Sequence, residues 1–165
     1  MASLALQSMD YFIKEGEEAY KAGDFRKGAM IFVKALRSYK DVDNTEAQAA
    51  IAMYHLAHFY IEQKQFKKAE SLLEKSCTLL NRTNVSKKSV SMVVEKLADV
   101  NTMQSHFKEA SQLYKRCIDL NLSGTDEDRD LSRRYLKLSD ALFQLGQNEQ
   151  ALNYVNLGIT ACSYK

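Results

Sequence analysis

The sequence predicts an all-α protein, a right-handed α-solenoid of four helix-turn-helix repeats with about eight helices, in a single domain over residues 1–165. Three observations predict this fold class. Apolar side chains recur at i, i+3 and i+4 through most of the chain, small residues return every 41 residues, and short polar segments separate the helical stretches. Stacked helix pairs of this kind form a superhelix whose concave face is lined by the first helix of each pair.

Apolar periodicity places the helices in order along the chain. They are expected at about 8–22, 25–39, 45–63, 66–80, 87–104, 107–120, 128–145 and 148–162. Gly23 and Asp24 separate the first two, because glycine tolerates the left-handed conformation after a helix and aspartate accepts hydrogen bonds from the first amides of the next helix. In the middle of the chain, AESLLEKSCTLL and MVVEKLADV carry the helical spacing.

Small residues in fixed columns define the repeat. Inside a helix, Gly16 and Gly28 each cost roughly 0.5–1 kcal/mol relative to alanine, so close approach of a neighbouring backbone is the expected reason for them. The three small columns run Gly16, Ala57, Ala98, Ser139; Gly28, Ala69, Ala110, Ala151; and Ala35, Ser76, Cys117, Gly158. Two columns of large residues run Phe12, Met53, Val94, Tyr135; and Phe32, Leu73, Tyr114, Val155.

Two further columns mark the turn inside each repeat. The turn column runs Gly23, Lys64, Ser105, Gly146, and the aromatic column after it runs Phe25, Phe66, Phe107, with Asn148 as the exception. Seven columns in one register divide the chain into repeats at about 9–43, 50–84, 91–125 and 132–165.

The columns resemble the tetratricopeptide repeat, in which a small residue lies midway along the first helix and small, large and small residues follow along the second. The resemblance covers about residues 9–160. The commonest form of that family has a 34-residue period and a closing proline, whereas this chain repeats every 41 residues and has no proline. The longer spacing is similar to that of the repeats of kinesin light chains and of Pins-type polarity adaptors. The segment GEEAYKAGDFRKGAMIFVKAL resembles the first repeat of the Pins-type adaptors in its residue pattern.

The resemblance also implies which residues face the concave groove, by their distance from the small residue of each first helix. These residues are Ile13, Glu17, Tyr20, Tyr54, His58, Ile61, Glu95, Asp99, Leu136, Asp140 and Phe143. The carboxylates among them predict a partner segment that is basic and amphipathic, with apolar anchors supplying affinity. The alternative is that the acids are solvated helix surface and the aromatic residues pack between repeats.

One subclass of the family is disfavoured by the same comparison. Repeats that clamp the C-terminal carboxylate of a chaperone use a lysine three places before the small residue and an asparagine just after it. The corresponding residues in the first repeat are Ile13 and Glu17, so an acidic tail is expected to be repelled.

Composition predicts a cytosolic or nuclear protein, and we expect a cytoplasmic location. No stretch approaches the ~18 apolar residues of a membrane span, and MASLALQSMDYF lacks the basic start and cleavage site of a signal peptide. Membrane insertion is therefore not expected. Cys77, Cys117 and Cys162 have no disulfide or metal spacing and are expected to be reduced and structural.

The sequence gives little indication of a catalytic site or of a cofactor. His55 and His58 lie three residues apart with Glu62 four beyond His58, a spacing that could place metal ligands, but a third ligand in the right position is not evident. No phosphate-binding glycine loop and no Gly-x-Ser-x-Gly motif occurs. We therefore expect no metal site, no cofactor and no enzymatic activity.

Nucleic-acid binding is a weaker alternative. The sequence pI is about 8.3, but 23 basic and 21 acidic residues are interleaved and give a net charge of only +2. The basic pairs Lys67-Lys68, Lys87-Lys88 and Arg133-Arg134 are separated along the chain rather than gathered beside stacking aromatic residues.

Two classes of function follow. The leading prediction is a non-catalytic adaptor whose concave face binds a peptide segment of a partner protein. The alternative is an assembly module that builds a larger complex through its terminal and convex faces. The last predicted helix carries Leu152, Val155 and Ile159, which must be covered by more of a longer repeat protein, by another copy through self-association of the C-terminal edge, or only lightly in a degenerate repeat.

Overall fold

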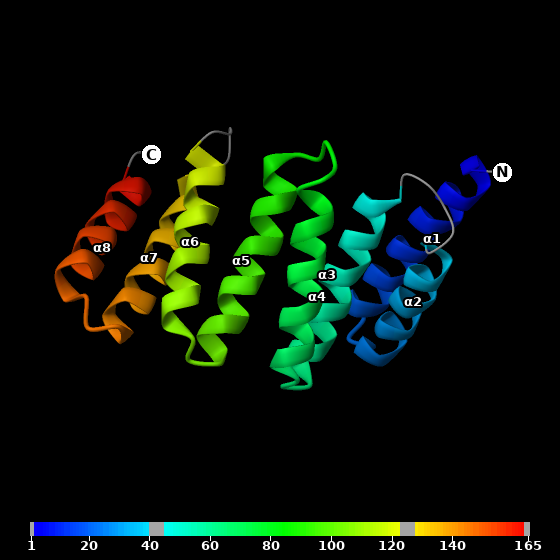
Figure 1. Cartoon of the computed structure of the whole chain (residues 1–165), viewed down its shortest axis with the longest axis horizontal. Helices are drawn as coiled ribbons and strands as arrows, with labels where there is room; N and C mark the ends of the chain where they lie inside the picture. The colour runs from blue at the N-terminus through cyan, green and yellow to red at the C-terminus, as the bar shows by residue number, and fades with distance from the viewer. Residues whose placement is uncertain (1, 40–44, 123–127, 164–165) are drawn as a thin grey trace. The chain divides into compact units, whose positions relative to one another are not determined.

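The computed structural model describes the backbone of residues 2–39, 45–122 and 128–163 and the side chains of 10–39, 45–120 and 130–162. Within these ranges the chain forms eight helices (Figure 1): α1 (Ala2–Lys21), α2 (Phe25–Ser38), α3 (Glu46–Glu62), α4 (Phe66–Leu80), α5 (Lys87–Met103), α6 (Phe107–Leu122), α7 (Asp128–Gln144) and α8 (Asn148–Ser163). The predicted all-α class and the eight predicted helices are confirmed. The largest difference is that α1 begins at Ala2 rather than near residue 8, in a stretch rich in the good helix formers Ala, Leu and Gln.

The chain divides into two compact units, each made of two helical hairpins. Unit 1 is Met1–Val85 and contains α1 to α4, and unit 2 is Ser86–Lys165 and contains α5 to α8. The predicted repeat ends at residues 43, 125 and 165 lie outside the described residues.

Each unit has its own hydrophobic core, in which a second helix packs on the first helix of the next hairpin. In unit 1, side chains of α2 meet those of α3 in the cluster Ala29, Phe32, Ala35, Tyr39, Ala49, Ala52 and Leu56. In unit 2, side chains from all four helices form the cluster Ala98, Ala110, Tyr114, Ile118, Leu138, Ala141, Leu142 and Ala151. The same interface between successive hairpins therefore occurs once in each unit.

The small columns are confirmed as positions of close approach between helices. A Cβ added at Gly16 would lie 2.6 Å from Cζ of Phe32, and one added at Gly28 would lie 3.2 Å from the carbonyl oxygen of Gly16. The alanines in these columns are almost completely buried: Ala57, Ala98, Ala69, Ala110, Ala151 and Ala35. The fixed small residues thus set the distance between the two helices of a hairpin.

Residues of the third small column also join the two helices through hydrogen bonds. Ser76 donates its hydroxyl to the carbonyl oxygen of Ala50 at 2.8 Å, and Cys117 donates its thiol to that of Ser91 at 3.4 Å. In the last hairpin the direction is reversed, because Ser132 donates to the carbonyl oxygen of Gly158 at 2.7 Å. These bonds explain why serine and cysteine are accepted at buried positions.

The turn column adopts one backbone conformation in all four hairpins. The φ angles are positive at Gly23 (80°), Lys64 (55°), Ser105 (62°) and Gly146 (73°). Each turn also repeats the same pair of backbone hydrogen bonds, as between Gln65 N and Tyr60 O and between Lys64 N and Ile61 O, both at 2.8 Å. This is the helix C-terminal motif in which a left-handed residue lets the last carbonyl groups accept bonds.

Candidate protein-binding surface

The predicted groove residues all lie on the first helix of a hairpin, and the structure is described for each unit separately. In unit 1 they are Ile13, Glu17 and Tyr20 on α1 and Tyr54, His58 and Ile61 on α3, all of them half-buried. In unit 2 they are Glu95 and Asp99 on α5 and Leu136, Asp140 and Phe143 on α7. The two sets differ in chemistry.

In unit 1, a side-chain hydrogen bond joins α1 to α3. Nε2 of His55 lies 3.0 Å from Oε1 of Glu17, and the His55 ring stacks on that of Phe32 with centroids 5.0 Å apart and an interplanar angle of 8°. Burial lowers the pKa of His55, and the charge and hydrogen bond of Glu17 offset this only in part. The carboxylate of Glu17 is thus engaged with a histidine that favours its neutral form.

Aromatic rings and a second histidine complete this part of the surface. Tyr20 OH lies 3.4 Å from Nδ1 of His58, and the rings of Tyr54 and His58 meet edge to face with centroids 4.8 Å apart. Burial and the charge of Glu62 raise the pKa of Tyr20, which therefore stays protonated. This arrangement offers amphipathic ring surface with hydrogen-bonding groups at its edge.

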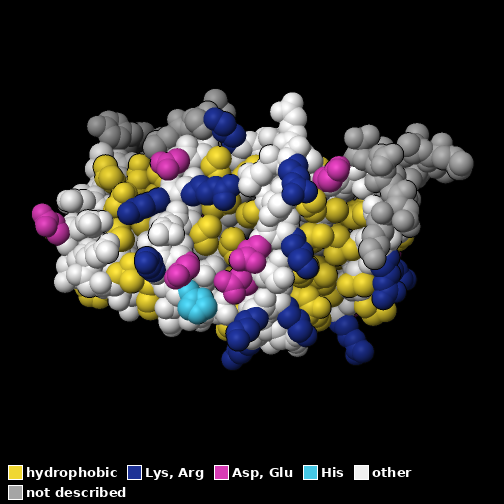
Figure 2. All heavy atoms as spheres, viewed as in Figure 1, with side chains coloured by type: hydrophobic (Ala, Val, Ile, Leu, Met, Phe, Trp, Pro, Cys, Tyr) yellow, Lys and Arg dark blue, Asp and Glu magenta, His cyan; other side chains and the backbone are white. Residues whose placement is uncertain are grey.

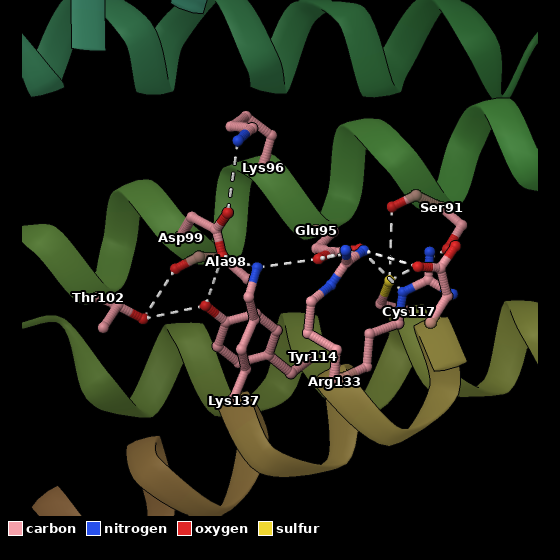
Figure 3. A network of polar contacts seen from close by, with 12 residues as sticks. Ser91, Glu95, Lys96, Ala98, Asp99, Thr102, Tyr114, Cys117, Arg133 and Lys137 are labelled. Carbon is pink, nitrogen blue, oxygen red and sulfur yellow. Dashed lines mark hydrogen bonds and ion pairs between the residues drawn. The ribbon is translucent and has the colours of Figure 1, made fainter. Parts of the chain in front are cut away.

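In unit 2, the carboxylate of Glu95 is buried among cations of α7 (Figure 3). Only 8% of Glu95 is exposed, and it accepts hydrogen bonds from Nε of Arg134 and Nζ of Lys137, both at 2.9 Å. Nη2 of Arg133 lies 3.3 Å from the same carboxylate. Burial alone would raise the pKa of Glu95, but the bonds from Lys137 and Arg134 and the charges of Lys137 and Arg133 outweigh it and hold the pKa below its usual value.

Asp99 is occupied in the same network. Its Oδ1 accepts hydrogen bonds from Nζ of Lys137 and from the hydroxyl of Tyr114, both at 2.8 Å, and Nζ of Lys96 lies 3.5 Å from Oδ2. Burial alone would lower the pKa of Lys137, but its bonds to Asp99 and Glu95 raise it. Lys137 therefore stays charged and ties α5 to α7.

These contacts change the expected charge of the surface. The acids of the sequence-predicted stripe were expected to face a basic partner, whereas Glu95 and Asp99 already have cationic partners inside unit 2. The carboxylate of Asp140 is exposed, and that of Glu17 is partly exposed. The surface therefore offers less negative charge to a partner than the sequence predicted.

Apolar side chains on α7 remain open to solvent beside Asp140. Leu136 is 42% exposed and Phe143 is 63% exposed. Together with Asp140 they occupy positions i, i+4 and i+7, which lie on one face of a helix. This face combines two apolar anchors with one carboxylate.

Four charged or titratable residues that organise the surface were not among the predicted groove residues: His55, Arg133, Arg134 and Lys137. The pairing of Lys137 could have been predicted from the sequence, because Lys137 lies one place beyond the position equivalent to Glu95 in the next repeat. The predicted columns contain neither Lys137 nor the Arg133-Arg134 pair, so the pairing of these cations with Glu95 was missed.

Other kinds of site receive little support from the described residues. Among them, no group of three or more histidine, cysteine or acidic side chains could hold a metal ion. In the same part of the chain, no helix is long and apolar enough to cross a membrane. Cys77 and Cys117 are buried and Cys162 is exposed, and none of these three cysteines forms a disulfide. On the face drawn in Figure 2, basic and acidic side chains are scattered among apolar and uncharged atoms.

Comparison with protein families decides the classification. Two models described as tetratricopeptide repeat match residues 48–123 and residues 132–163. The chain belongs to the tetratricopeptide repeat family. The resemblance seen in the sequence columns is thereby confirmed, and the two matches cover the second to fourth repeats.

Solved structures share this fold at low sequence identity. BtubC (BKLC) from P. vanneervenii superposes with a TM-score of 0.86 at 16% identity, over 94% of this chain and 63% of that one. Aspartyl phosphate phosphatase F from Bacillus subtilis gives 0.82 at 17% identity, over 94% of this chain and 40% of that one. A Podospora anserina protein with putative kinesin light chain nearly identical TPR-like repeats gives 0.80 at 15% identity, over 96% and 77%.

These similarities show the tetratricopeptide repeat fold and no specific activity. The chain spans less than two thirds of the first two of these structures, 63% and 40% of their lengths. A search of curated proteins gives no significant match.

Proposed function

We propose that this tetratricopeptide repeat protein is a non-catalytic adaptor that binds a peptide segment of a partner protein on its first-helix surfaces. In unit 1 the surface is formed by the predicted residues of α1 and α3, and in unit 2 by those of α5 and α7. Membership of a protein-interaction repeat family supports binding of a protein. The proposal needs no metal or cofactor.

The observation that carries the proposal is the exposed face of α7. Leu136 and Phe143 leave apolar surface in water on either side of the Asp140 carboxylate. Exposed apolar side chains grouped with a charge are typical of interaction sites, where the apolar groups supply affinity and the charge supplies orientation.

The preferred partner is an amphipathic segment with apolar anchors and a basic residue for Asp140. Its basic character is expected to be modest, because Glu95 and Asp99 are neutralised within unit 2. A strongly basic peptide would also meet Arg133, whose side chain is 55% exposed. The proposal therefore places affinity in the apolar contacts.

The test is capture of partners on purified variants with quantitative mass spectrometry. A Phe143→Ser, Asp140→Lys double variant should lose the partner, because it removes the exposed ring and reverses the charge. Met30→Ser is the matched control, since Met30 on the second helix α2 is 57% exposed and is equally apolar. Circular dichroism must first show that both variants are as helical as the wild type.

The outcome that contradicts the proposal is equally clear. Retention of the same proteins by the double variant, at wild-type amounts, would remove α7 as the binding surface. Loss of the same proteins on Met30→Ser alone would place binding on the second helices.

A further inference from the structure

Basic side chains recur on the exposed side of the two second helices of unit 1. α2 carries four cations and no carboxylate, and α4 carries three cations and two carboxylates. In the 41-residue register, three positions are basic and exposed in both helices, and we call them the basic columns: Arg26 and Lys67, Lys27 and Lys68, and Lys34 and Lys75. The second and third positions are seven residues apart on each helix, so they lie on one face.

The exposure of these positions does not depend on which hairpins are next to a helix. Within the two units, α2 and α6 each precede another hairpin, and α4 and α8 each follow one. All four helices are exposed at the three positions, whereas other sides of the same helices are buried, as at Phe32 in α2 and Tyr114 in α6. Neither a preceding nor a following hairpin therefore covers this side of a second helix.

The charge at these positions distinguishes unit 1 from unit 2. In unit 2 the corresponding pairs are Lys108 and Glu149, Glu109 and Gln150, and Arg116 and Leu157. Each pair in unit 1 thus consists of two cations, and no pair in unit 2 does. The repeat itself does not require positive charge at these positions.

Helix stability does not explain the cations at the start of α2 and α4. The N-terminus of a helix is the positive end of its dipole, so carboxylates in the first turn stabilise the helix and cations there destabilise it. The first turns of α2 and α4 contain no acidic residue, and each contains two cations. The second helices of unit 2 have Glu109 and Glu149 in their first turns. The cations of unit 1 are therefore placed against the helix dipole, which indicates a role outside the helix.

From these observations we infer that the basic columns of unit 1 form a second docking surface, separate from the proposed peptide-binding face. Its occupant is an acidic segment of a partner protein, whose carboxylates pair with the lysine and arginine side chains of α2 and α4. Exposed charge pairs contribute modestly to affinity and more to orientation and to the rate of association. Binding at this surface is therefore sensitive to salt.

Two features of the surface favour an acidic protein segment over a nucleic acid or a membrane. The exposed Glu74 lies seven residues after Lys67 on the same face of α4, and Asp24 precedes the cations of α2. A segment with separate carboxylates can avoid these two acids, whereas the closely spaced phosphates of a nucleic acid meet them. Membrane attachment requires apolar side chains that insert. Among the large apolar side chains of α2 and α4, both of which the structure describes in full, Met30 alone is exposed.

The test measures binding of a labelled peptide of alternating glutamate and glycine to the full chain by fluorescence anisotropy at low salt. A peptide of alternating glutamine and glycine is the uncharged control. Two double variants reverse the charge of the basic columns: Arg26→Glu, Lys34→Glu on α2 and Lys67→Glu, Lys75→Glu on α4. The matched control variant on α6 makes the same change of charge at the same register positions of unit 2: Lys108→Glu, Arg116→Glu.

We expect saturable binding of the glutamate peptide to the wild type, and affinity about tenfold weaker or more for either unit 1 variant. The α6 variant should change the affinity by less than about threefold, because its charges lie outside the basic columns. Each double variant places a glutamate in the first turn of a helix, which the dipole favours, so the melting temperature should not fall. A loss of binding in a variant that melts like the wild type is then a loss of the surface.

Three results would overturn the inference. One is the absence of binding of the glutamate peptide to the wild type, or equal binding of the glutamine peptide. A second is equal weakening by the α6 variant, which would mean that net charge alone governs binding. The third is tighter binding of single-stranded oligothymidylate or of phosphatidylserine vesicles than of the peptide, lost in the unit 1 variants, because the occupant would then be a nucleic acid or a membrane. None of these results bears on Phe143 and Asp140, so the proposed peptide-binding function is tested separately.

Discussion

Buried charge at Glu95 is the residue-scale feature that most affects both stability and the surface. Arg134, 2% exposed, and Glu95, 8% exposed, form one pair inside unit 2, while Arg133 approaches the same carboxylate from a 55% exposed position. A buried ion pair contributes little net stability when intact, yet removal of one partner leaves an uncompensated charge in the interior.

This difference in burial predicts unequal effects of two adjacent substitutions. Arg134→Met should lower the free energy of unfolding by roughly 1–3 kcal/mol, because it removes a charge-assisted hydrogen bond from the buried Glu95 carboxylate, which keeps Lys137 and Arg133 as partners. Arg133→Met, the matched control, should cost at most about 1 kcal/mol, as expected for an exposed pair. Urea denaturation measures both, and equal losses would show that burial does not decide the effect.

His55 gives unit 1 a residue-scale dependence on pH. Burial lowers the pKa of His55 in the folded protein below its ordinary value of 6.5, in spite of the nearby Glu17 carboxylate. The unfolded chain therefore binds a proton first as the pH falls. The stability that neutral His55 contributes is present above about pH 6.5 and is lost as the pH falls toward the folded-state pKa.

The prediction is that wild-type stability decreases between about pH 7.5 and pH 5.5 and that His55→Gln decreases less over the same range. Glutamine keeps a hydrogen-bond donor for Glu17 and cannot titrate. Chemical denaturation at several pH values provides the measurement. All other titratable groups are the same in both proteins, so parallel pH profiles would exclude His55 as the cause.

At the scale of the helical hairpin, the left-handed turn residue determines where each first helix ends. Two hairpins use glycine, at Gly23 and Gly146, and two use residues with a Cβ, at Lys64 and Ser105, all with positive φ. A side chain in this conformation costs roughly 1–2 kcal/mol. The two non-glycine turns therefore store strain that tertiary packing overcomes.

Two substitutions at the turn residue test whether the left-handed conformation costs stability. Ser105→Gly should raise the free energy of unfolding by about 1 kcal/mol, and Gly146→Ala should lower it by a similar amount. An added Cβ at Gly146 meets nothing within 4 Å, so the cost there is one of backbone conformation alone. Thermal melting of both variants measures the effect. Stabilisation by Gly146→Ala would show that the left-handed conformation is not the controlling factor.

At the scale of the whole molecule, charge balance governs which macromolecules bind without specificity. The chain has 23 basic and 21 acidic residues and a net charge of +2. Arg133, Arg134 and Lys137 all approach carboxylates in unit 2. Cations that already pair with carboxylates would have to give up those pairs to bind phosphate groups, so they add little to the affinity for a nucleic acid.

We therefore predict no saturable binding of a labelled duplex DNA or single-stranded RNA at about 150 mM salt. Fluorescence anisotropy titration checks this directly. Binding that weakens steeply as salt increases would reveal an exposed basic surface and contradict the prediction. Confirmation would leave proteins as the partner class that the family membership favours.

Most of the fold could be predicted from the sequence, because the repeat is defined by patterns of residues that lie close together along the chain. Gly16, Gly28 and the turn column each report a constraint within one hairpin: close approach of two helices, or a positive φ. Seven columns in one register predicted eight helices and the family, and both are confirmed. The early start of α1 was missed, because no small residue of the columns falls before Gly16.

The sequence by itself determined the helices, the turns and the residues that bring helices together, since these depend on neighbours a few residues apart. Only the tertiary structure decided which charges are free. Glu95 meets Arg134 and Lys137 across 39 and 42 residues, and Glu17 meets His55 across the gap between α1 and α3. Electrostatic energy depends on the distance between side chains in space, so Glu95 and Asp99 have cationic partners that the sequence did not predict, whereas Asp140 stays exposed.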